Sequence, residues 1–381
     1  MRVGFDGTNI LGHGGIKTYA RELLRGLATE FPDDSFHVLT TFSASKRDKV
    51  AAALGGFPNL EVRSAVPHRL MLGEKLLPAT RIAGRILWRS ACRGLDLVHL
   101  TDPFGAVVLR KGSVSTVHDL FPLTREEYSG TELRRRYTVL APRVLELSGA
   151  VITPSDYIRN QLMELFPQCS TPLMTVPEAA SETFTHDGER RGDPGHGLRP
   201  DGYFLFVGRI DRRKNLPVLL EAHRRLPRGV REGHPLVLVL SDDRAARTTG
   251  HTVDLGPAGD GTGPVVLRDL PDSDLVRLYA NATAFVFPSL DEGFGLPVLE
   301  AMSAGCPVVT SGISCLPEVA GDAAVLVDPF SPEDLASAME SLATSPELRR
   351  EYGSRGLSRA RLFSWGRTAR ETMRVYRKLV P

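Results

Sequence analysis

Short apolar segments alternate with helix-like segments along almost the whole chain, and this alternation constrains the fold more than any other feature. In the first half, segments with strand character cover residues 3–5, 36–39, 96–100, 114–117, 151–153 and 174–176. Two helices are clear between them, over residues 16–27 and 156–166, and Ser155 is the expected N-cap of the second. Such alternation is typical of parallel sheets covered by helices.

A break in this pattern divides the chain. Residues 181–202 are rich in Gly, Pro, Asp and Arg, and residues 188–200 have almost no apolar content, which indicates a linker or loop. Residues 244–263, rich in Gly and Thr, are expected to form a second loop. After the break, strand character returns at residues 203–207, 236–240, 265–267, 284–287, 307–310 and 325–327, with a helix over 216–225 that Asn215 is expected to cap. A chain of 381 residues is long for one core. We predict an α/β protein of two doubly wound, Rossmann-like domains.

The segment 288–300, which reads PSLDEGFGLPVLE, carries the most specific chemistry. A glycine turn leads into a helix expected over residues 296–304, and Pro297 suits the first turn of that helix. The amides expected at this helix N-terminus, a favourable site for an anion, are those of Phe294, Gly295 and Leu296. Glu292 in the turn and Glu300 in the first helical turn bracket them.

Other candidate residues also follow predicted strands. In doubly wound sheets, ligands bind beyond the carboxyl ends of the strands. The residues in such positions are Gly14, Gly15, His118, Arg209, Lys214 and Glu292. We therefore expect all of them to face one interdomain cleft.

Several segments together resemble the motifs of a known enzyme family. Glu292 and Glu300, with seven residues between them, resemble the paired glutamates of retaining glycosyltransferases of the GT-B fold. The likeness is closest to glycosyltransferase family 4, and especially to bacterial mannosyltransferase-like group 1 enzymes. The resembling segments are Gly14-Gly15, Val117-His118-Asp119, Val207-Gly208-Arg209 with Lys214, and residues 288–300, 316–322 and 363–365. They span nearly the whole chain in the order that the family has.

This resemblance implies a division of labour between the domains. Residues 1–180 would form an N-terminal domain that binds the acceptor, and residues 181–363 a C-terminal domain that binds the nucleotide-sugar donor. A last helix within residues 364–381 would pack back onto the N-terminal domain.

The resemblance also implies roles for single residues. Catalytic roles fall to His118, Arg209, Lys214 and Glu292, and donor binding to Gly14, Gly15, Arg209, Lys214, Phe294, Gly295, Leu296 and Glu300. An arginine fork and a lysine point charge suit a departing diphosphate. Glu300 would bind the ribose hydroxyls, Glu292 the transferred sugar, and His118 would orient sugar hydroxyls through its ring or its carbonyl group.

Each of these residues also has a plainer interpretation. Arg209 and Lys214 lie in a basic turn that solvent alone would explain, and a Gly-Gly pair is an ordinary loop. Acidic residues favour helix N-termini, which explains Glu300 better than Glu292. The family pattern favours the functional interpretation.

Charge and composition argue against nucleic-acid-binding and metal-binding classes of protein. The net charge of +2 argues against a general nucleic-acid binder. The four cysteines lack the spacing of metal ligands, and no Asp-x-Asp metal motif stands out. The acidic pairs at 33–34 and 242–243 are interpreted as solvated loop charge. We expect neither a metal nor another cofactor.

Membrane association is limited to a surface contact. No signal peptide precedes the first strand, and no apolar run approaches the roughly 20 residues of a membrane span. A cytoplasmic location is therefore expected. Basic residues recur every fourth position from 81 to 93, at Arg81, Arg85, Arg89 and Arg93. This spacing makes one basic helix face, either a solvated surface or a peripheral contact with the inner face of the membrane.

The sequence thus predicts a metal-independent, retaining glycosyltransferase. It would move a hexosyl group from GDP-mannose or a UDP-sugar to a hydroxyl of a glycan, a lipid-linked sugar or a small natural product. Two alternatives stay open: a sugar-nucleotide epimerase of the same fold, and an inactive transferase-like partner subunit. A nicotinamide-binding enzyme is disfavoured, because no Gly-x-Gly-x-x-Gly follows the first strand.

Overall fold

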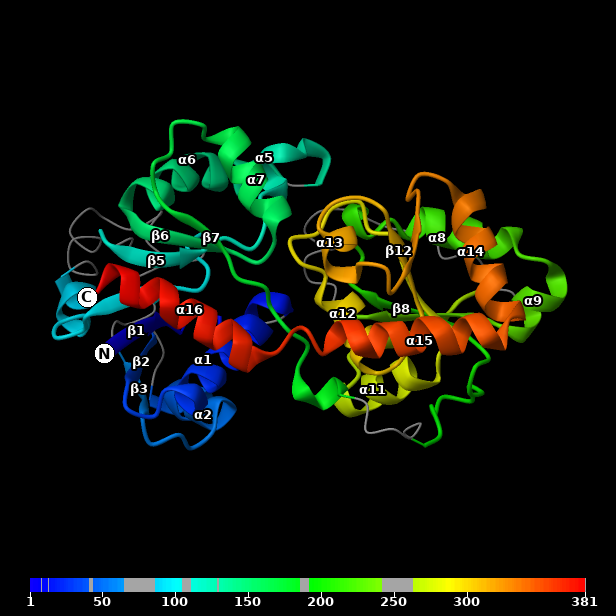
Figure 1. Ribbon diagram of the computed structural model, residues 1–381, viewed down its shortest axis with the longest axis horizontal. Helices are drawn as coiled ribbons and strands as arrows, with labels where there is room; N and C mark the ends of the chain where they lie inside the picture. The colour runs from blue at the N-terminus through cyan, green and yellow to red at the C-terminus, as the bar shows by residue number, and fades with distance from the viewer. Residues whose placement is uncertain are drawn as a thin grey trace. The chain divides into compact units, whose positions relative to one another are not determined.

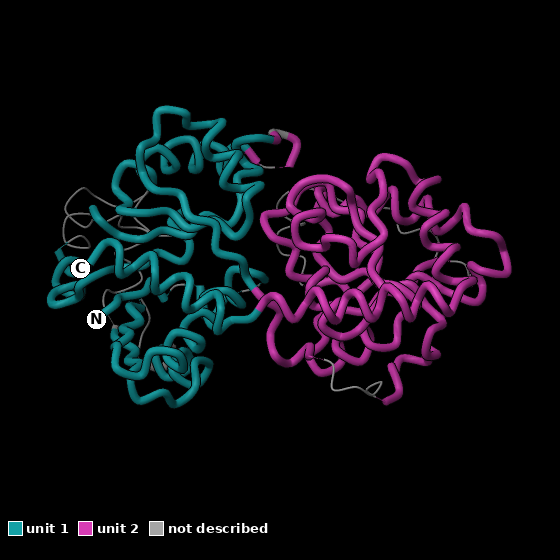
Figure 2. The backbone as a smooth tube through the Cα atoms, in the orientation of Figure 1, with its two compact units in different colours: residues 1–124, 131–178, 364–381 teal, residues 125–130, 179–363 magenta. Residues whose placement is uncertain are grey.

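The computed structural model divides into two compact units (Figure 2). Unit 1 comprises residues 1–124, 131–178 and 364–381, and unit 2 comprises residues 125–130 and 179–363. The structure describes residues 1–7, 9–12, 14–40, 44–64, 86–104, 111–128, 130–185, 192–241 and 263–380. The predicted loop over 244–263 lies almost wholly outside this part of the chain.

Unit 1 is built on a seven-stranded parallel sheet with the order β3-β2-β1-β4-β5-β6-β7. The strands are β1 (Arg2–Asp6), β2 (Ser35–Thr40), β3 (Leu60–Ser64), β4 (Leu97–Leu100), β5 (Ser113–Thr116), β6 (Ser148–Thr153) and β7 (Leu173–Thr175). The described α-helices of unit 1 are α1 (Gly15–Glu30), α2 (Ala44–Leu54), α5 (Phe121–Thr124), α6 (Thr131–Leu147), α7 (Asp156–Leu165) and α16 (Trp365–Leu379), and all are labelled in Figure 1.

Unit 2 is built on a six-stranded parallel sheet with the order β10-β9-β8-β11-β12-β13. Its strands are β8 (Phe204–Gly208), β9 (Leu236–Leu240), β10 (Val265–Arg268), β11 (Ala284–Phe287), β12 (Val308–Ser311) and β13 (Val325–Val327). Its α-helices are α8 (Leu216–Arg225), α9 (Arg228–Gly233), α11 (Asp272–Asn281), α12 (Leu296–Ser303), α13 (Leu316–Ala320), α14 (Pro332–Thr344) and α15 (Pro346–Ala360). Short 3-10 turns are η1 (Glu126–Tyr128), η2 (Glu182–Phe184) and η3 (Arg212–Lys214).

Both sheets have the strand order of doubly wound folds, so the predicted fold class is confirmed for each unit. The order reverses beside β1 in unit 1 and beside β8 in unit 2. At each reversal the connections leave toward opposite faces and open a crevice beyond the strand ends. Residues that follow β8 and β11 therefore meet at one such crevice.

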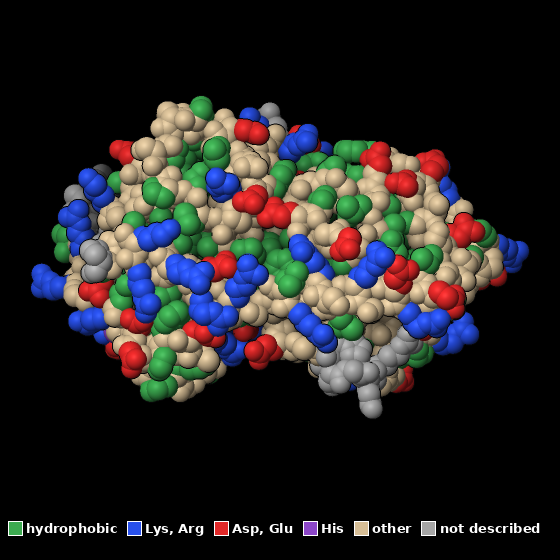
Figure 3. Space-filling view, in the orientation of Figure 1, with side chains coloured by type: hydrophobic (Ala, Val, Ile, Leu, Met, Phe, Trp, Pro, Cys, Tyr) green, Lys and Arg blue, Asp and Glu red, His purple; other side chains and the backbone are tan. Residues whose placement is uncertain are grey.

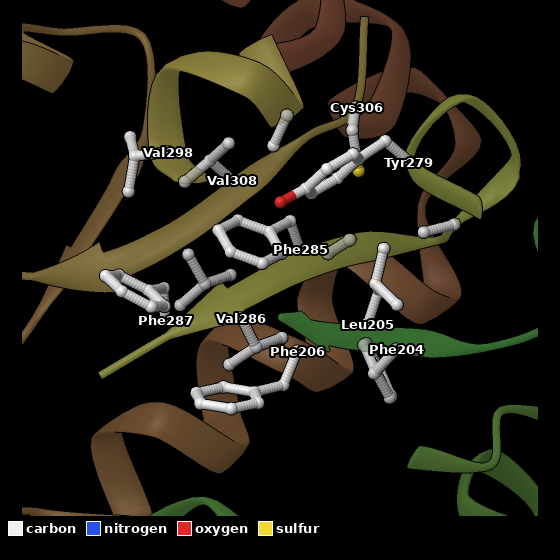
Figure 4. Close-up of a cluster of buried hydrophobic side chains, with 14 of the residues drawn as sticks. Phe204, Leu205, Phe206, Tyr279, Phe285, Val286, Phe287, Val298, Cys306 and Val308 are labelled. Atoms are coloured by element: carbon white, nitrogen blue, oxygen red, sulfur yellow. The ribbon is translucent and has the colours of Figure 1, made fainter. Parts of the chain in front are cut away.

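The inner strands β9 and β11 of unit 2 are wholly apolar and buried on both faces. Every residue of β9, which reads LVLVL, is buried. In unit 2 the aromatic side chains of β8 and β11 pack with Tyr279 of α11 (Figure 4). The rings of Phe206 and Phe287 stack with their centroids 6.0 Å apart. This packing fixes the strands from which the site loops depart.

Serine caps set several helix starts, and Asn215 holds the expected N-cap position of α8 without a side-chain cap bond. The Ser155 hydroxyl accepts a hydrogen bond from the Ile158 amide, which confirms its predicted role. Asn215 precedes α8 but makes no side-chain cap, because its backbone is left-handed and its amide donates to the Pro329 carbonyl at 2.6 Å. Its side chain thus links two loops and does not cap the start of α8.

The last helix, α16, belongs to unit 1 and packs against α1 (Figure 1). A buried polar chain joins it to the sheet: the Tyr376 hydroxyl lies 2.6 Å from His99 Nδ1, and His99 Nε2 lies 2.7 Å from Thr116 Oγ1. Tyr19 of α1 completes the chain through its own hydroxyl, 2.8 Å from Thr116. Burial lowers the pKa of His99 to about 3, so the ring is neutral and uses one nitrogen as donor and the other as acceptor.

Tyr376→Phe should destabilise the protein by about 1–3 kcal/mol, because His99 Nδ1 would lose its partner in a buried site. The measurement is urea unfolding followed by circular dichroism. Tyr352→Phe is the matched control, since the Tyr352 hydroxyl makes no hydrogen bond with any described residue, and its effect should stay within about 0.5 kcal/mol. Equal effects of the two substitutions would contradict a structural role for the His99–Tyr376 bond.

Candidate functional site

The predicted residues of unit 2 gather where β8 and β11 lie side by side. These two strands pair in parallel, so both end at the same edge of the sheet. Arg209 follows β8 directly, and residues 288–292 follow β11. The site is therefore positioned by the sheet itself, at its topological switch point.

The turn before α12 depends on one glycine. Gly295 is the N-cap of α12 and has φ 94°, which L side chains rarely adopt. A Cβ atom there would lie 2.7 Å from Leu316 Cδ2. With this turn, the amides of Phe294, Gly295 and Leu296 donate to no acceptor among the described residues. They form a helix N-terminus that suits an anion.

A second loop is attached to this turn through backbone and side-chain bonds. Asp211 caps η3 by accepting from the Arg213 amide at 2.9 Å, and it also pairs with the Arg213 guanidinium. The Arg213 carbonyl accepts from the Leu290 amide at 2.6 Å and lies 2.9 Å from the Ser289 hydroxyl. The loops that follow β8 and β11 are thus held together.

Lys214 and Glu292 form an ion pair within this arrangement. Lys214 Nζ lies 2.5 Å from Glu292 Oε1, and the two side chains are only 12% and 10% exposed. The same carboxylate oxygen accepts from the Ser289 hydroxyl at 2.6 Å. Lys214 Nζ also lies 4.7 Å from the centre of the Phe287 ring. The cation and the carboxylate expected to bind different parts of a ligand are here each other's partners.

Arg209 differs from Lys214 in both exposure and pairing. Its side chain is exposed, and it makes no hydrogen bond or ion pair with any residue that the structure describes. An exposed guanidinium directly after β8 is available to an anionic ligand.

Glu300 lies in the second turn of α12, not in the first turn as expected, since no acidic residue occupies the first turn. Its Oε2 accepts from the Tyr279 hydroxyl at 3.3 Å (Tyr279 is drawn in Figure 4). Burial raises the pKa of Glu300 to about 7; the Tyr279 hydrogen bond opposes this rise and the charge of Asp272 adds to it. A helix-dipole preference therefore does not explain this carboxylate, which strengthens its candidacy as a binding group.

In unit 1, Gly14 and Gly15 begin α1. Gly14 is the N-cap with φ 75°, and no side chain caps this end of the helix. Tyr19, one turn further along α1, contacts the His118 ring edge-on with centroids 4.6 Å apart. The glycine turn and His118 thus belong to neighbouring parts of one unit.

Both ring nitrogens of His118 are occupied. Nε2 donates to the Thr101 carbonyl at 2.8 Å, and Nδ1 lies 3.0 Å from Glu178 Oε1. Burial lowers the pKa of His118, but the hydrogen bond and charge of Glu178 outweigh it, so the pKa lies above its ordinary value. The ring is held as a donor at both nitrogens, which makes it unsuited to act as a base.

Sequence reasoning missed four partners of these side chains: Asp211, Ser289, Tyr279 and Glu178. Ser289 stands within the segment that the sequence singled out, three residues before Glu292. Asp211 stands two residues before its partner Arg213, whereas Tyr279 and Glu178 come from other elements, and no spacing in the sequence connects these two to the residues that they contact.

The structure bears on three further features of the sequence: metal ligands, the two acidic pairs and membrane-spanning segments. Within the described residues, no group of three or more His, Cys, Asp or Glu side chains could hold a metal ion. Asp34 pairs with the N-terminal amine, and residues 242–243 lie outside the described part. In the described chain, no helix is long and apolar enough to cross a membrane.

The predicted basic helix face is also incomplete. Arg81 and Arg85 lie outside the described residues, while Arg89 and Arg93 are exposed and Trp88 is buried. Basic side chains also gather over α16 in the space-filling view (Figure 3). Several of these are paired with carboxylates, such as Arg367 with Glu371 and Arg370 with Glu30. Contact of either surface with a membrane stays a prediction.

Comparison with known proteins gives the family. Residues 13–179 match the model described as Glycosyltransferase Family 4, and residues 195–359 match Glycosyl transferases group 1. The chain is 33% identical over 273 residues to O-antigen chain mannosyltransferase B of Escherichia coli, covering 70% of each protein.

Solved structures agree on the fold. Sucrose-phosphate synthase from Thermosynechococcus elongatus superposes with a TM-score of 0.75 at 20% identity, covering 100% of this chain and 99% of that one. Anabaena Alr3699/HepE in complex with UDP and glucose gives 0.71 at 16% identity, covering 99% and 100%. The chain therefore belongs to the family 4, group 1 glycosyltransferases and has their GT-B fold, with two parallel-sheet Rossmann-like domains.

Proposed function

We propose that this glycosyltransferase moves a mannosyl group from a nucleoside-diphosphate sugar to an acceptor hydroxyl, with retention of the anomeric configuration and without a metal ion. The observation that carries the proposal is that the loops with Arg209, Lys214 and the α12 N-terminus follow two paired parallel strands, β8 and β11, at the switch point of the sheet. Mannose is favoured by the similarity to O-antigen chain mannosyltransferase B. A UDP-sugar is the second candidate donor, because the HepE structure contains UDP and glucose.

The leaving diphosphate is the group that needs stabilisation. Negative charge develops on its oxygens as the bond to the sugar breaks, and fixed donors aimed at that charge lower the barrier. In our proposal Arg209 and Lys214 supply cations, and the Phe294, Gly295 and Leu296 amides supply the helix end. With these donors in place, the site needs no divalent cation at the phosphates.

The carboxylates bind rather than attack. Glu292 Oε1 is occupied by Lys214 and Ser289, so we assign this residue to sugar hydroxyls and not to a covalent intermediate. Glu300 would accept hydrogen bonds from the ribose. His118 has no free ring nitrogen to take a proton, and its role would be to orient groups. Retention would then arise from acceptor attack on the face that the diphosphate leaves.

The two units would divide these tasks. Unit 2 would hold the donor, and unit 1, which carries Gly14, Gly15 and His118, would hold the acceptor. The cleft predicted between them, the peripheral membrane contact and the cytoplasmic location stay predictions.

The function can be tested in two steps. Calorimetric titration with UDP, GDP, ADP and dTDP identifies the nucleotide, and proton NMR of the first product formed from the matching sugar donor gives the anomeric configuration. We expect an α-linked product from an α-linked donor, at an unchanged rate in EDTA. Failure of every nucleoside diphosphate to bind at millimolar concentration would overturn the proposal. An altered free sugar would indicate the epimerase, and binding without turnover would indicate the inactive subunit.

Arg209→Ala should lower kcat by about 100-fold, equivalent to about 3 kcal/mol, because one donor to the developing charge is lost. Steady-state kinetics at saturating donor measure this change. Arg212→Ala is the matched control: Arg212 is also exposed and basic, lies three residues further on, and is given no role. A near-normal kcat for Arg209→Ala would exclude Arg209 from the reaction.

Nucleoside-diphosphate affinity should rise by up to about tenfold between pH 6 and pH 8, because Glu300, with a pKa of about 7, is neutral below that pH and ionised above it. The ionised carboxylate accepts ribose hydroxyls more strongly. The glutamine in Glu300→Gln does not titrate, so the difference in slope between the two proteins belongs to Glu300. Identical pH profiles for the two proteins would show that Glu300 does not bind the ribose.

A further inference from the structure

The Lys214–Glu292 ion pair has a consequence for ligand discrimination. The two side chains come from loops 78 residues apart in the chain, and both are nearly buried. Each charge is compensated by the other, and removing one partner from such a pair leaves an uncompensated charge in a poorly hydrated site, which is costly. A ligand that binds only one of these two side chains leaves the other uncompensated, and its affinity is lower for that reason.

The oxygens of Glu292 are not equivalent. Oε1 receives both Lys214 Nζ and the Ser289 hydroxyl, whereas Oε2 accepts no hydrogen bond from any described residue. Ser289 is fully buried and is held in place because its carbonyl accepts from the Ser311 hydroxyl at 2.6 Å. Glu292 therefore stays anchored at Oε1 by Ser289 when Lys214 leaves, and Oε2 remains available to a ligand hydroxyl.

We propose that Lys214 and Glu292 exchange partners on donor binding, so that the site binds the intact nucleotide sugar in preference to the nucleoside diphosphate alone. The inference rests on the proposed function. The diphosphate takes Lys214 and the sugar hydroxyls take Glu292, and one molecule thereby compensates both charges. After transfer the sugar is gone, Glu292 is left without its ligand, and the re-forming pair with Lys214 weakens the hold on the product diphosphate. Ser289 acts as the positioning residue that keeps Glu292 in reach of both partners.

The test is a calorimetric double-mutant cycle with Lys214→Met, Glu292→Gln and the double variant, each titrated with the nucleoside diphosphate and its sugar form. Glu292→Gln alone should tighten diphosphate binding by about tenfold, because Lys214 no longer has to leave a carboxylate. It should also abolish the preference for the sugar form. On the Lys214→Met background, Glu292→Gln should change diphosphate affinity by less than about twofold, because no pair remains to be broken.

Controls separate this exchange from simple repulsion. Equal tightening with and without Lys214 would mean that Glu292 merely repels the phosphates, and no tightening at all would show that the pair is not broken on binding; either result overturns the exchange. Glu221→Gln removes an exposed, ion-paired carboxylate of the same unit and should leave both affinities unchanged. Glu292→Met serves as a second variant if Glu292→Gln does not fold, with the same expectations.

The same titrations distinguish failure of the partner exchange from failure of the proposed function. If wild-type protein binds the diphosphate and Arg209→Ala weakens it while the cycle shows no coupling, the exchange fails and the proposed function stands. If wild-type protein binds no nucleoside diphosphate, both fail.

Discussion

The parallel pairing of β8 with β11 is the constraint on which the candidate site depends. It brings two loops far apart in the chain to one edge of the sheet, and the Arg213 carbonyl then joins them by accepting from the Leu290 amide. Without that pairing, Lys214 and Glu292 would have no reason to meet. The apolar packing of Phe206 against Phe287 beneath the loops therefore supports the chemistry as directly as the polar residues do.

Charge compensation shapes the rest of the site. Lys214 is paired and Arg213 is paired with Asp211, whereas Arg209 is exposed and makes no bond with the described residues. Glu292 is paired, whereas Glu300, among the residues that the structure describes, is bonded only by the Tyr279 hydroxyl and has a raised pKa. One cation and one carboxylate are thus ready for a ligand, and the other two must first separate. A ligand with an anion at its centre and hydroxyl groups on both sides would satisfy all four.

The sequence predicted the fold class and the strands at 236–240 and 284–287 because buried parallel strands are almost wholly apolar, and it predicted the edge strand at 325–327 because that strand is apolar too. It missed β3, an edge strand that mixes charged and apolar residues. Ser155 was predictable because a cap acts within one helical turn, but the bond from Asn215 to Pro329 spans 114 residues and leaves no local signal. The Lys214–Glu292 pair was missed for the same reason, although both residues were predicted for the site.

The hydrogen bonds of His118 argue against a role for this residue as a general base. A general base needs a nitrogen that can take a proton, yet both nitrogens of this ring donate, to Thr101 and to Glu178. Glu178 is the last residue of unit 1 before the chain enters unit 2, and Thr368 of the returning α16 donates to the neighbouring Pro177 carbonyl. His118 therefore fixes the point where the chain leaves unit 1. A substitution there would disturb that crossing as well as any ligand contact, so loss of activity in a His118 variant would not by itself identify a catalytic residue.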